Sequence, residues 1–181
     1  QGPATLYLMS AAAALMPFLG SAGVLWNAFG TDMAGFRAFV LSPVSRSRIL
    51  MGKNLAVLPI VALPGTLFLV LLSFFFHFGA AAFVLAMLAA AQMFIMQCAI
   101  GNFCSIFFPY PCRFDQVQDR NVSNRKLLGG LLSWFLTGLS LVPVMLLHFS
   151  PLILLKLLSV DAPLICVAAS AIFLLILTAA Y

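Results

Sequence analysis

Charged residues are rare in this chain, and many of them gather in one stretch that interrupts an otherwise apolar sequence. The chain has nine basic and four acidic residues, and five of these lie between positions 27 and 53: Asp32, Arg37, Arg46, Arg48 and Lys53. Side chains of these types pair with opposite charges on a protein partner or contact lipid phosphates at a membrane surface. This stretch is therefore the first candidate for a functional site.

Within this stretch the pattern predicts a short amphipathic helix over residues 33–41. Asp32 can cap its first turn, because a carboxylate accepts hydrogen bonds from the free N–H groups there. Phe36 and Val40 lie on one apolar face, and Pro43 prevents the helix from continuing. An apolar face on a short loop must be buried, and the pattern leaves open whether a partner protein or the bilayer surface covers it.

The residue pattern lacks the constellations that enzymes use. Gly52-Lys53 comes nearest to a phosphate-binding loop, but Ser47 stands where that motif needs a glycine and Asn54 where it needs serine or threonine. No HExxH zinc motif occurs, and no apolar run contains an acidic residue for acid–base chemistry. We therefore expect no catalytic, cofactor or metal site in this chain.

The elements that must position the charged stretch are membrane helices. Hydrophobic residues make up 64% of the chain and charged residues 7%, and the mean hydropathy is +1.16. In an ordinary soluble domain about a quarter of the residues are charged. The long apolar runs lack the period-two alternation of barrel strands, so helices must satisfy the backbone in hydrocarbon. The predicted fold class is an all-α integral membrane protein.

The apolar runs divide into five spans, since about twenty residues cross a bilayer as a helix. The predicted spans are residues 4–26, 54–76, 81–108, 127–149 and 164–181. His77-Phe78-Gly79 is the polar break in the middle of a long uncharged run, so the second and third spans should form a hairpin there. Ser150-Pro151 should mark a turn into a short re-entrant or interfacial segment before the last span.

Several residues within the spans predict contacts between helices. Gln97, Gly101 and Ser105 form a small and polar stripe that suits close packing of the third span against a neighbour. Pro59 and Pro64 should kink or unwind the second span. The four cysteines show neither disulfide nor metal spacing and are interpreted as packing residues: Cys98, Cys104, Cys112 and Cys166.

The distribution of charge predicts the orientation. Loop 27–53 holds four basic residues and one acidic residue, and loop 109–126 holds four basic and two acidic residues. Short loops rich in Lys and Arg stay in the cytoplasm, so both loops should lie inside. His77 and His148 then become amphipathic residues at the outer boundary. At the same end, Phe74-Phe75-Phe76 are a candidate hydrophobic gate, with packing or contact with lipid as the alternative.

Three phrases of the first loop resemble a known family. They are Asn27-x-Phe29-Gly30-x-Asp32-x-x-Gly35-Phe36-Arg37, then Leu41-Ser42-Pro43-Val44-Ser45-Arg46, then Ile49-Leu50-x-Gly52-Lys53-Asn54-Leu55. In these phrases the chain resembles the permease subunits of type-2 ATP-binding-cassette exporters. The resemblance implies that the spans are the second to sixth of a six-span half-transporter. The chain is then expected to be a single permease domain that is incomplete at its N-terminus, and its last span is a candidate for truncation.

In that family a coupling helix in this loop docks into a cleft on a nucleotide-binding subunit. The resemblance therefore implies that Phe36 and Val40 fill an apolar cleft, that Arg37 pairs with an acidic residue of the ATPase, and that Asp32 fixes the helix start. The residues to which it assigns ATPase coupling are Asp32, Gly35, Phe36, Arg37, Val40, Ser42, Pro43, Arg46 and Lys53.

The function implied is that of one transmembrane half of an ATP-driven exporter. Its partners would be a separate ATPase subunit that holds ATP and Mg²⁺, a second permease half, and membrane lipid, with no nucleic acid. The expected location is the bacterial cytoplasmic (inner) membrane. The uncharged spans favour apolar, amphipathic or lipid-like cargo. The alternative is a non-transporting anchor or scaffold subunit that binds partners or anionic lipid through its basic loops.

Overall fold

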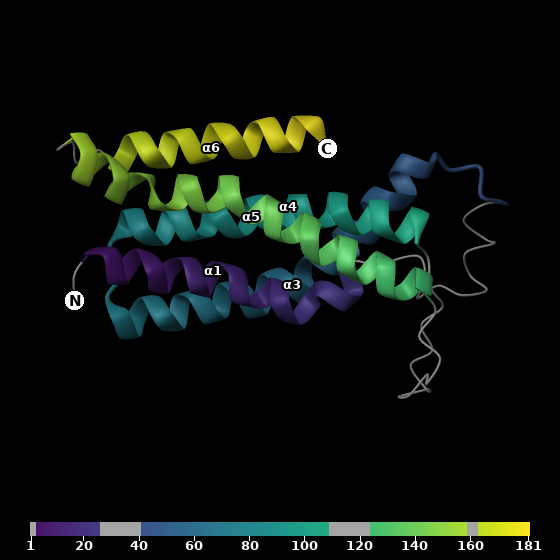
Figure 1. Ribbon diagram of the computed structural model, residues 1–181, viewed down its shortest axis with the longest axis horizontal. Helices are drawn as coiled ribbons and strands as arrows, with labels where there is room; N and C mark the ends of the chain where they lie inside the picture. The colour runs from purple at the N-terminus through teal and green to yellow at the C-terminus, as the bar shows by residue number, and fades with distance from the viewer. Residues whose placement is uncertain (1–2, 26–40, 109–123, 159–162) are drawn as a thin grey trace.

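The computed structural model describes residues 3–25, 41–108, 124–158 and 163–181, and this part of the chain forms a bundle of long helices (Figure 1). The helices are α1 (Pro3–Leu25), α3 (Arg46–Phe76), α4 (Ala80–Phe107), α5 (Asn124–Leu158) and α6 (Pro163–Ala180). They run side by side along the long axis, and no strand occurs in the described ranges. The predicted all-α fold class is confirmed.

Four of these helices are long and apolar enough to cross a membrane. They are α3, α4, α6 and residues Leu127–Leu154 of α5. Helix α1 has 23 residues, but its apolar segment, Leu6–Pro17, is shorter than the length needed to cross a membrane. The predicted first span over residues 4–26 therefore stays a prediction, whereas a protein integral to a membrane follows from the other four helices.

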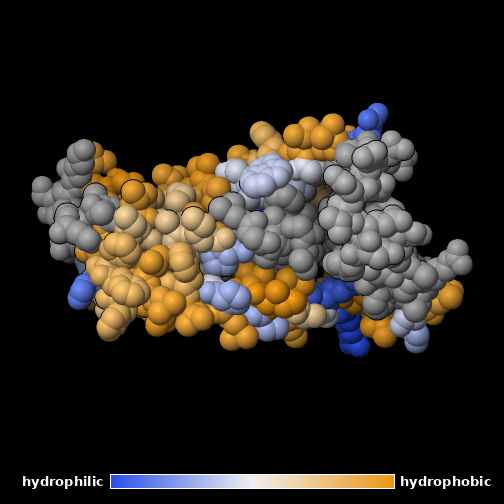
Figure 2. Space-filling model, turned by 90° about the horizontal axis from the view of Figure 1, so that it is seen from below, coloured by the Kyte–Doolittle hydropathy of each residue, from blue (hydrophilic) through white to orange (hydrophobic). Residues whose placement is uncertain are grey.

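The distribution of side chains between inside and outside is that of a membrane bundle. Many buried core residues are small, such as Ala13 and Ala86, and several buried residues are polar. Large side chains such as Leu63 and Leu175 point outward, exposed by 72% and 69%. In Figure 2 hydrophobic residues cover most of the visible face, and the deepest blue lies toward the end at which α3 begins. Small residues inside allow close helix packing, and lipid covers the large ones outside.

Helix α4 is the centre of the bundle, since it packs against all four of the other helices. It buries eleven residues, among them Gln97, Gly101 and Ser105. The stripe predicted from these three residues therefore does face neighbouring helices. The outer helices bury far fewer residues: Asn54, Val61 and Leu69 on α3, which packs mainly against α1, and Cys166 and Ser170 on α6.

The hairpin predicted between the second and third spans is confirmed. Helix α3 ends at Phe76, and His77 adopts a left-handed conformation with φ 54° and ψ 53°. The N–H of Phe78 then donates to the carbonyl of Ser73 at 3.2 Å, which is the long bond of a Schellman motif. Gly79 is the N-cap of α4, so three residues reverse the chain.

The turn predicted at Ser150-Pro151 is wrong. Helix α5 continues through both residues to Leu158, and its last turns bend toward the start of α6 (Figure 1). Pro151 has no N–H to donate to the carbonyl of Leu147, and the hydroxyl of Ser150 donates to that carbonyl instead, at 2.6 Å. Because the free acceptor is satisfied locally, the proline bends the helix without ending it. The segment expected to be re-entrant is thus helical as far as Leu158.

Two expectations about the second span also change. Helix α3 begins at Arg46 rather than near Asn54, so the last two turns of the predicted loop 27–53 are helical. A helix can continue beyond its apolar part into charged residues. The change from charged to apolar residues therefore indicates where the membrane begins, not where the helix begins. The helix is also continuous through Pro59 and Pro64, so it is not unwound there.

The position of His148 at the outer boundary stays a prediction, but its side chain is buried inside the bundle rather than exposed at a surface. Its side chain is only 1% exposed and lies between α5 and α1. Its Nε2 lies 3.1 Å from the carbonyl of Tyr7 and 3.0 Å from Oγ of Ser10. Since a carbonyl can only accept, Nε2 carries the hydrogen. These hydrogen-bond partners on α1 offset the cost of burying a polar ring. They are distant in the sequence, so the residues next to His148 do not indicate its burial. His77, by contrast, is exposed as expected.

The cysteines in the described part of the chain are free and buried: Cys98, Cys104 and Cys166. Their interpretation as packing residues is confirmed, and Cys112 lies outside the described residues. Cys104 also accepts a hydrogen bond of 3.1 Å from Oγ of Ser133 on α5. Gln92 donates to Oγ of Ser170 on α6 at 2.8 Å. Such polar contacts between helices fix their rotation.

Candidate functional site

The described part of the first loop is exposed at the end of the bundle. Leu41 is helical, and a bend over residues 42–44 separates it from α3. The N–H of Val44 donates to Oγ of Ser42 at 3.3 Å, which stabilises the bend. Ser45 is the N-cap of α3 by its backbone, with φ −61° and ψ 141°. Leu41 is 84% exposed and Val44 45%, so the described residues of this chain leave apolar side chains of the bend uncovered.

The basic residues of the loop stand on the first two turns of α3. Arg46 and Arg48 are exposed, and Lys53 is half-buried. Helix turns place Arg48 on a different side of α3 from Arg46 and Lys53, since each residue advances the helix by about 100°. The start of α3 therefore presents positive charge in more than one direction.

The residues assigned to ATPase coupling are only partly described. Ser42, Pro43, Arg46 and Lys53 lie within one short segment that joins the bend to α3. The remaining five lie outside the described residues: Asp32, Gly35, Phe36, Arg37 and Val40. The docking face predicted over residues 33–41 therefore stays a prediction.

The candidate gate residues lie at the opposite end of α3. Phe74 and Phe75 are 78% and 69% exposed and make an edge contact with ring centroids 6.0 Å apart. Phe76 stacks on Phe78 of the hairpin turn, with centroids 6.4 Å apart. Two of the three rings thus point away from the helices of this chain. A gate built from them would require a second chain on that side.

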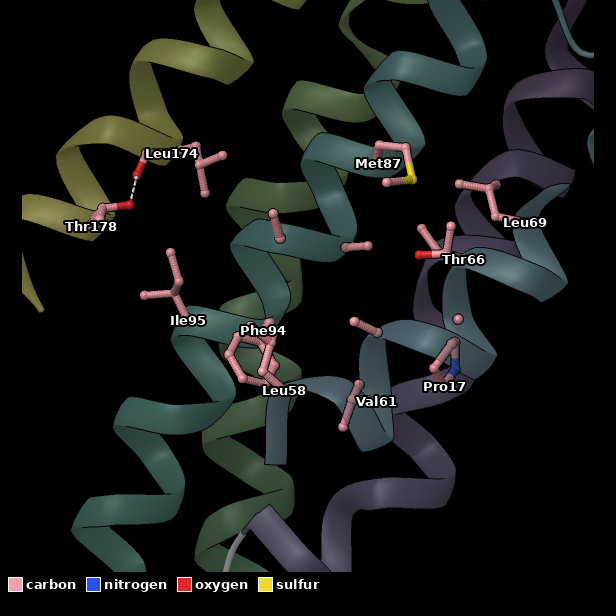
Figure 3. Close-up of a pocket in the computed structure, with 15 residues that line it drawn as sticks. Pro17, Leu58, Val61, Thr66, Leu69, Met87, Phe94, Ile95, Leu174 and Thr178 are labelled. Atoms are coloured by element: carbon pink, nitrogen blue, oxygen red, sulfur yellow. Dashed lines mark hydrogen bonds between the residues drawn. The ribbon is translucent and has the colours of Figure 1, made fainter. Parts of the chain in front are cut away.

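A cavity in the bundle is the feature that sequence analysis missed. Its volume is about 360 Å³, and it lies between α3 and α6, with α4 and α1 behind it (Figure 3). The lining is apolar apart from Thr66 and Thr178: Ala14, Pro17, Leu58, Val61, Ala62, Gly65, Thr66, Leu69, Met87, Ala90, Ala91, Phe94, Ile95, Leu174 and Thr178. Sequence pattern identifies apolar helices but not the rotation of each helix, so this lining could not be predicted.

A polar cluster lies just beyond one end of the cavity. The side-chain amides of Asn54 on α3 and Asn102 on α4 both donate to the hydroxyl of Tyr181, the second at 2.8 Å. The phenol accepts from both amides and keeps its own hydrogen for a further acceptor. Three helices contribute to this cluster.

The described residues do not bring together three or more His, Cys, Asp or Glu side chains in a metal-binding arrangement. Comparison with protein-family models, with curated proteins and with solved structures gave no match. The features of the chain that indicate a function are therefore the first loop, the cavity and helix α3.

Proposed function

We propose that this chain is one transmembrane half of an ATP-driven exporter, coupled through loop 27–53 to a separate ATPase subunit. The observation that supports this most is the packing of α3. This helix buries three residues, Asn54, Val61 and Leu69, and it continues directly from the exposed bend into the wall of the cavity. The loop whose sequence resembles the exporter family is thus joined to a helix that buries three of its 31 residues and lines the cavity.

Helix α3 can transmit a movement of loop 27–53, caused by the ATPase, to the cavity inside the bundle. A continuous helix of 31 residues transmits displacement along its whole length. A force at the bend would move α3 against α4, which buries eleven residues and contacts every other helix of the bundle. Because α3 is one wall of the cavity, such movement would change the cavity's opening. Coupling requires that the ATPase bind the two positions of the loop differently.

The remaining parts of the proposal follow the charge pattern and the family resemblance. The two basic loops lie in the cytoplasm of a bacterial cell by the positive-inside rule. ATP and Mg²⁺ are held by the ATPase subunit, and a second permease half completes the pathway. Arg37 pairs with an acidic residue of the ATPase, and Phe36 and Val40 enter its apolar cleft.

Substitution at the apolar face of the loop tests this proposal. Phe36→Asp should leave membrane insertion intact but abolish co-purification of the ATPase and the dependence of its hydrolysis rate on this chain. Phe36→Leu, which keeps an apolar side chain, is the matched control. Leu41→Asp is a second variant, and its 84% exposure means that folding should not suffer. An ATPase that co-purifies and remains fully stimulated by both Asp variants would contradict the coupling role.

A non-transporting anchor is the second candidate, and the exposure of Arg46 and Arg48 favours it. Such cations bind anionic membrane surfaces without any ATPase. Purification of the chain from native membranes separates the two candidates. A stoichiometric partner with a Walker A motif supports the exporter, and a partner without one supports the anchor.

A further inference from the structure

The cavity is a groove that several of the apolar helices line together: α3 and α6 on its two sides, with residues of α4 and α1 between them. Helices α3 and α6 form its two walls, and each packs against α4 without extensive contact with the other. In Figure 3 Leu174 and Thr178 of α6 face Leu69 and Thr66 of α3 across the space, with Phe94 of α4 between them. An apolar molecule that enters such a space gains the packing contacts that its lining otherwise lacks.

The size and the lining of the groove fit one hydrocarbon chain. An apolar cavity of about 150 Å³ accommodates benzene, so 360 Å³ corresponds to roughly fourteen carbon atoms on the same scale. An α-helix with its side chains is about 10 Å wide and needs far more room. The groove is therefore too small for a helix of a second copy and suits a single acyl chain.

Polar groups cap the groove at one end only. Asn54 lies one helical turn before the lining residue Leu58, Asn102 lies two turns after Ile95, and Tyr181 lies one turn after Thr178. The three side chains meet through the hydroxyl of Tyr181. That hydroxyl accepts from both amides, so its hydrogen can be donated to an ester or phosphate oxygen.

A cation continues the same face of α3 beyond the cap. Residues spaced by three and four lie on one side of a helix, and this spacing links Arg48, Met51, Leu55, Leu58 and Ala62. Met51 and Leu55 are 63% and 64% exposed, so an apolar strip joins the groove to the exposed guanidinium. The ten residues from Arg48 to Leu58 span about 15 Å, which the arginine side chain and the glycerol part of a lipid can bridge together.

We propose that this groove is a binding site for one anionic phospholipid of the leaflet at the α3 N-terminal end. One acyl chain fills the space between α3 and α6, the glycerol esters meet the hydroxyl of Tyr181, and the phosphate pairs with Arg48. The site is built within a single chain, so it does not depend on the exporter proposal.

Native mass spectrometry of the purified full chain in detergent tests the site. Palmitoyl-oleoyl-phosphatidylglycerol and the corresponding phosphatidylcholine are the probes. The wild type should bind one phosphatidylglycerol at least tenfold more tightly than further copies. Ala62→Phe and Thr178→Phe place a ring in the groove from opposite walls and should weaken this binding at least tenfold. Leu63→Phe and Ala179→Phe add similar bulk on neighbouring positions outside the lining and should not.

The headgroup contact has its own pair of variants. Arg48→Gln should reduce the preference for phosphatidylglycerol over phosphatidylcholine several-fold, whereas Arg46→Gln on another side of α3 should leave it unchanged. Equal binding by the wild type and both phenylalanine variants would overturn the site, as would a dimer that those variants dissociate. Equal effects of the two arginine variants would overturn the role of Arg48. None of these outcomes requires an ATPase.

Discussion

At the residue scale, polar side chains inside the bundle form hydrogen bonds with backbone carbonyl groups. Ser150 supplies the hydrogen bond that Pro151 cannot make, and Ser10 with the carbonyl of Tyr7 surrounds the buried ring of His148. The partners of His148 lie on α1, far away in the sequence, so the pattern around His148 does not indicate that its side chain is buried. The partner of Ser150 is local, and it explains why the turn predicted at Ser150-Pro151 is wrong.

His77 gives a prediction at this scale. Its left-handed backbone, with φ 54°, is costly for a residue with a Cβ, by about 1 kcal/mol. His77→Gly should therefore raise the free energy of unfolding by about that amount. Thermal unfolding of the purified chain in detergent is the measurement. Gly79→Ala is the control, because a Cβ there meets nothing within 4 Å and its φ is −64°. A loss of stability in His77→Gly would contradict the argument.

At the element scale, sequence and structure agree where the signal is local and differ where it is not. The hairpin at His77-Phe78-Gly79 and the packing stripe that includes Gly101 followed from polar breaks and from spacing along one helix. The start of α3 at Arg46 did not, because charge marks the edge of the lipid and says little about the backbone. The sequence also does not predict which helices pack against each other, because any apolar helix face can pack against several different neighbours.

Gly65 lies at a point where α3 approaches α1 closely. A Cβ on Gly65 would lie 2.9 Å from Cγ of Pro17, a ring that has little freedom to move. Gly65→Ala should therefore separate the two helices and cost about 1–3 kcal/mol. Gly52→Ala on the same helix meets nothing within 4 Å and should gain about 1 kcal/mol from helix propensity. Thermal unfolding compares the two variants, and equal gains in stability would show that the helices are not in contact there.

The buried pair Gln97 and Thr137 tests how polar contacts hold α4 to α5. Nε2 of Gln97 donates to Oγ1 of Thr137 at 3.0 Å. Hydrogen bonds between membrane helices contribute about 0.6 kcal/mol on average. A double-mutant cycle with Gln97→Leu and Thr137→Val should give a coupling energy near this value. Thr178 donates within its own helix, to the carbonyl of Leu174, so Gln97→Leu with Thr178→Val should show none. A coupling as large in this second cycle would refute the assignment.

At the scale of the whole molecule, the bundle divides into the deeply buried helix α4 and outer helices that bury few residues, such as α3 and α6. Helix α4 is buried on several sides and contacts every other helix. Helix α3 buries little, forms one wall of the cavity, and begins at the exposed bend. Composition indicated a membrane bundle, but this division depends on the depth at which each helix is buried. It is the property on which the proposed coupling rests.

The division predicts which helices move when the proposed ATPase works. Spin labels on Thr66→Cys and Thr178→Cys report the width of the groove, since the two exposed residues lie on opposite walls. In the complex with the ATPase, the distance between the labels should change by several ångströms between the nucleotide-free and ATP-bound states, because α3 buries three of its 31 residues and is joined to the loop that the ATPase would move. Electron paramagnetic resonance measures this distance, in a background with Cys112→Ser.

Labels on Phe103→Cys and Leu131→Cys are the matched control. Both side chains are exposed, and they stand on α4 and α5, which pack closely together. Their separation should stay constant in the two states, since neither helix is joined to the bend before α3. If both pairs moved alike, the bundle would move as a whole and α3 would have no separate role. If neither pair moved while ATP was hydrolysed, force at the loop would not reach the cavity, and the anchor function would be favoured instead.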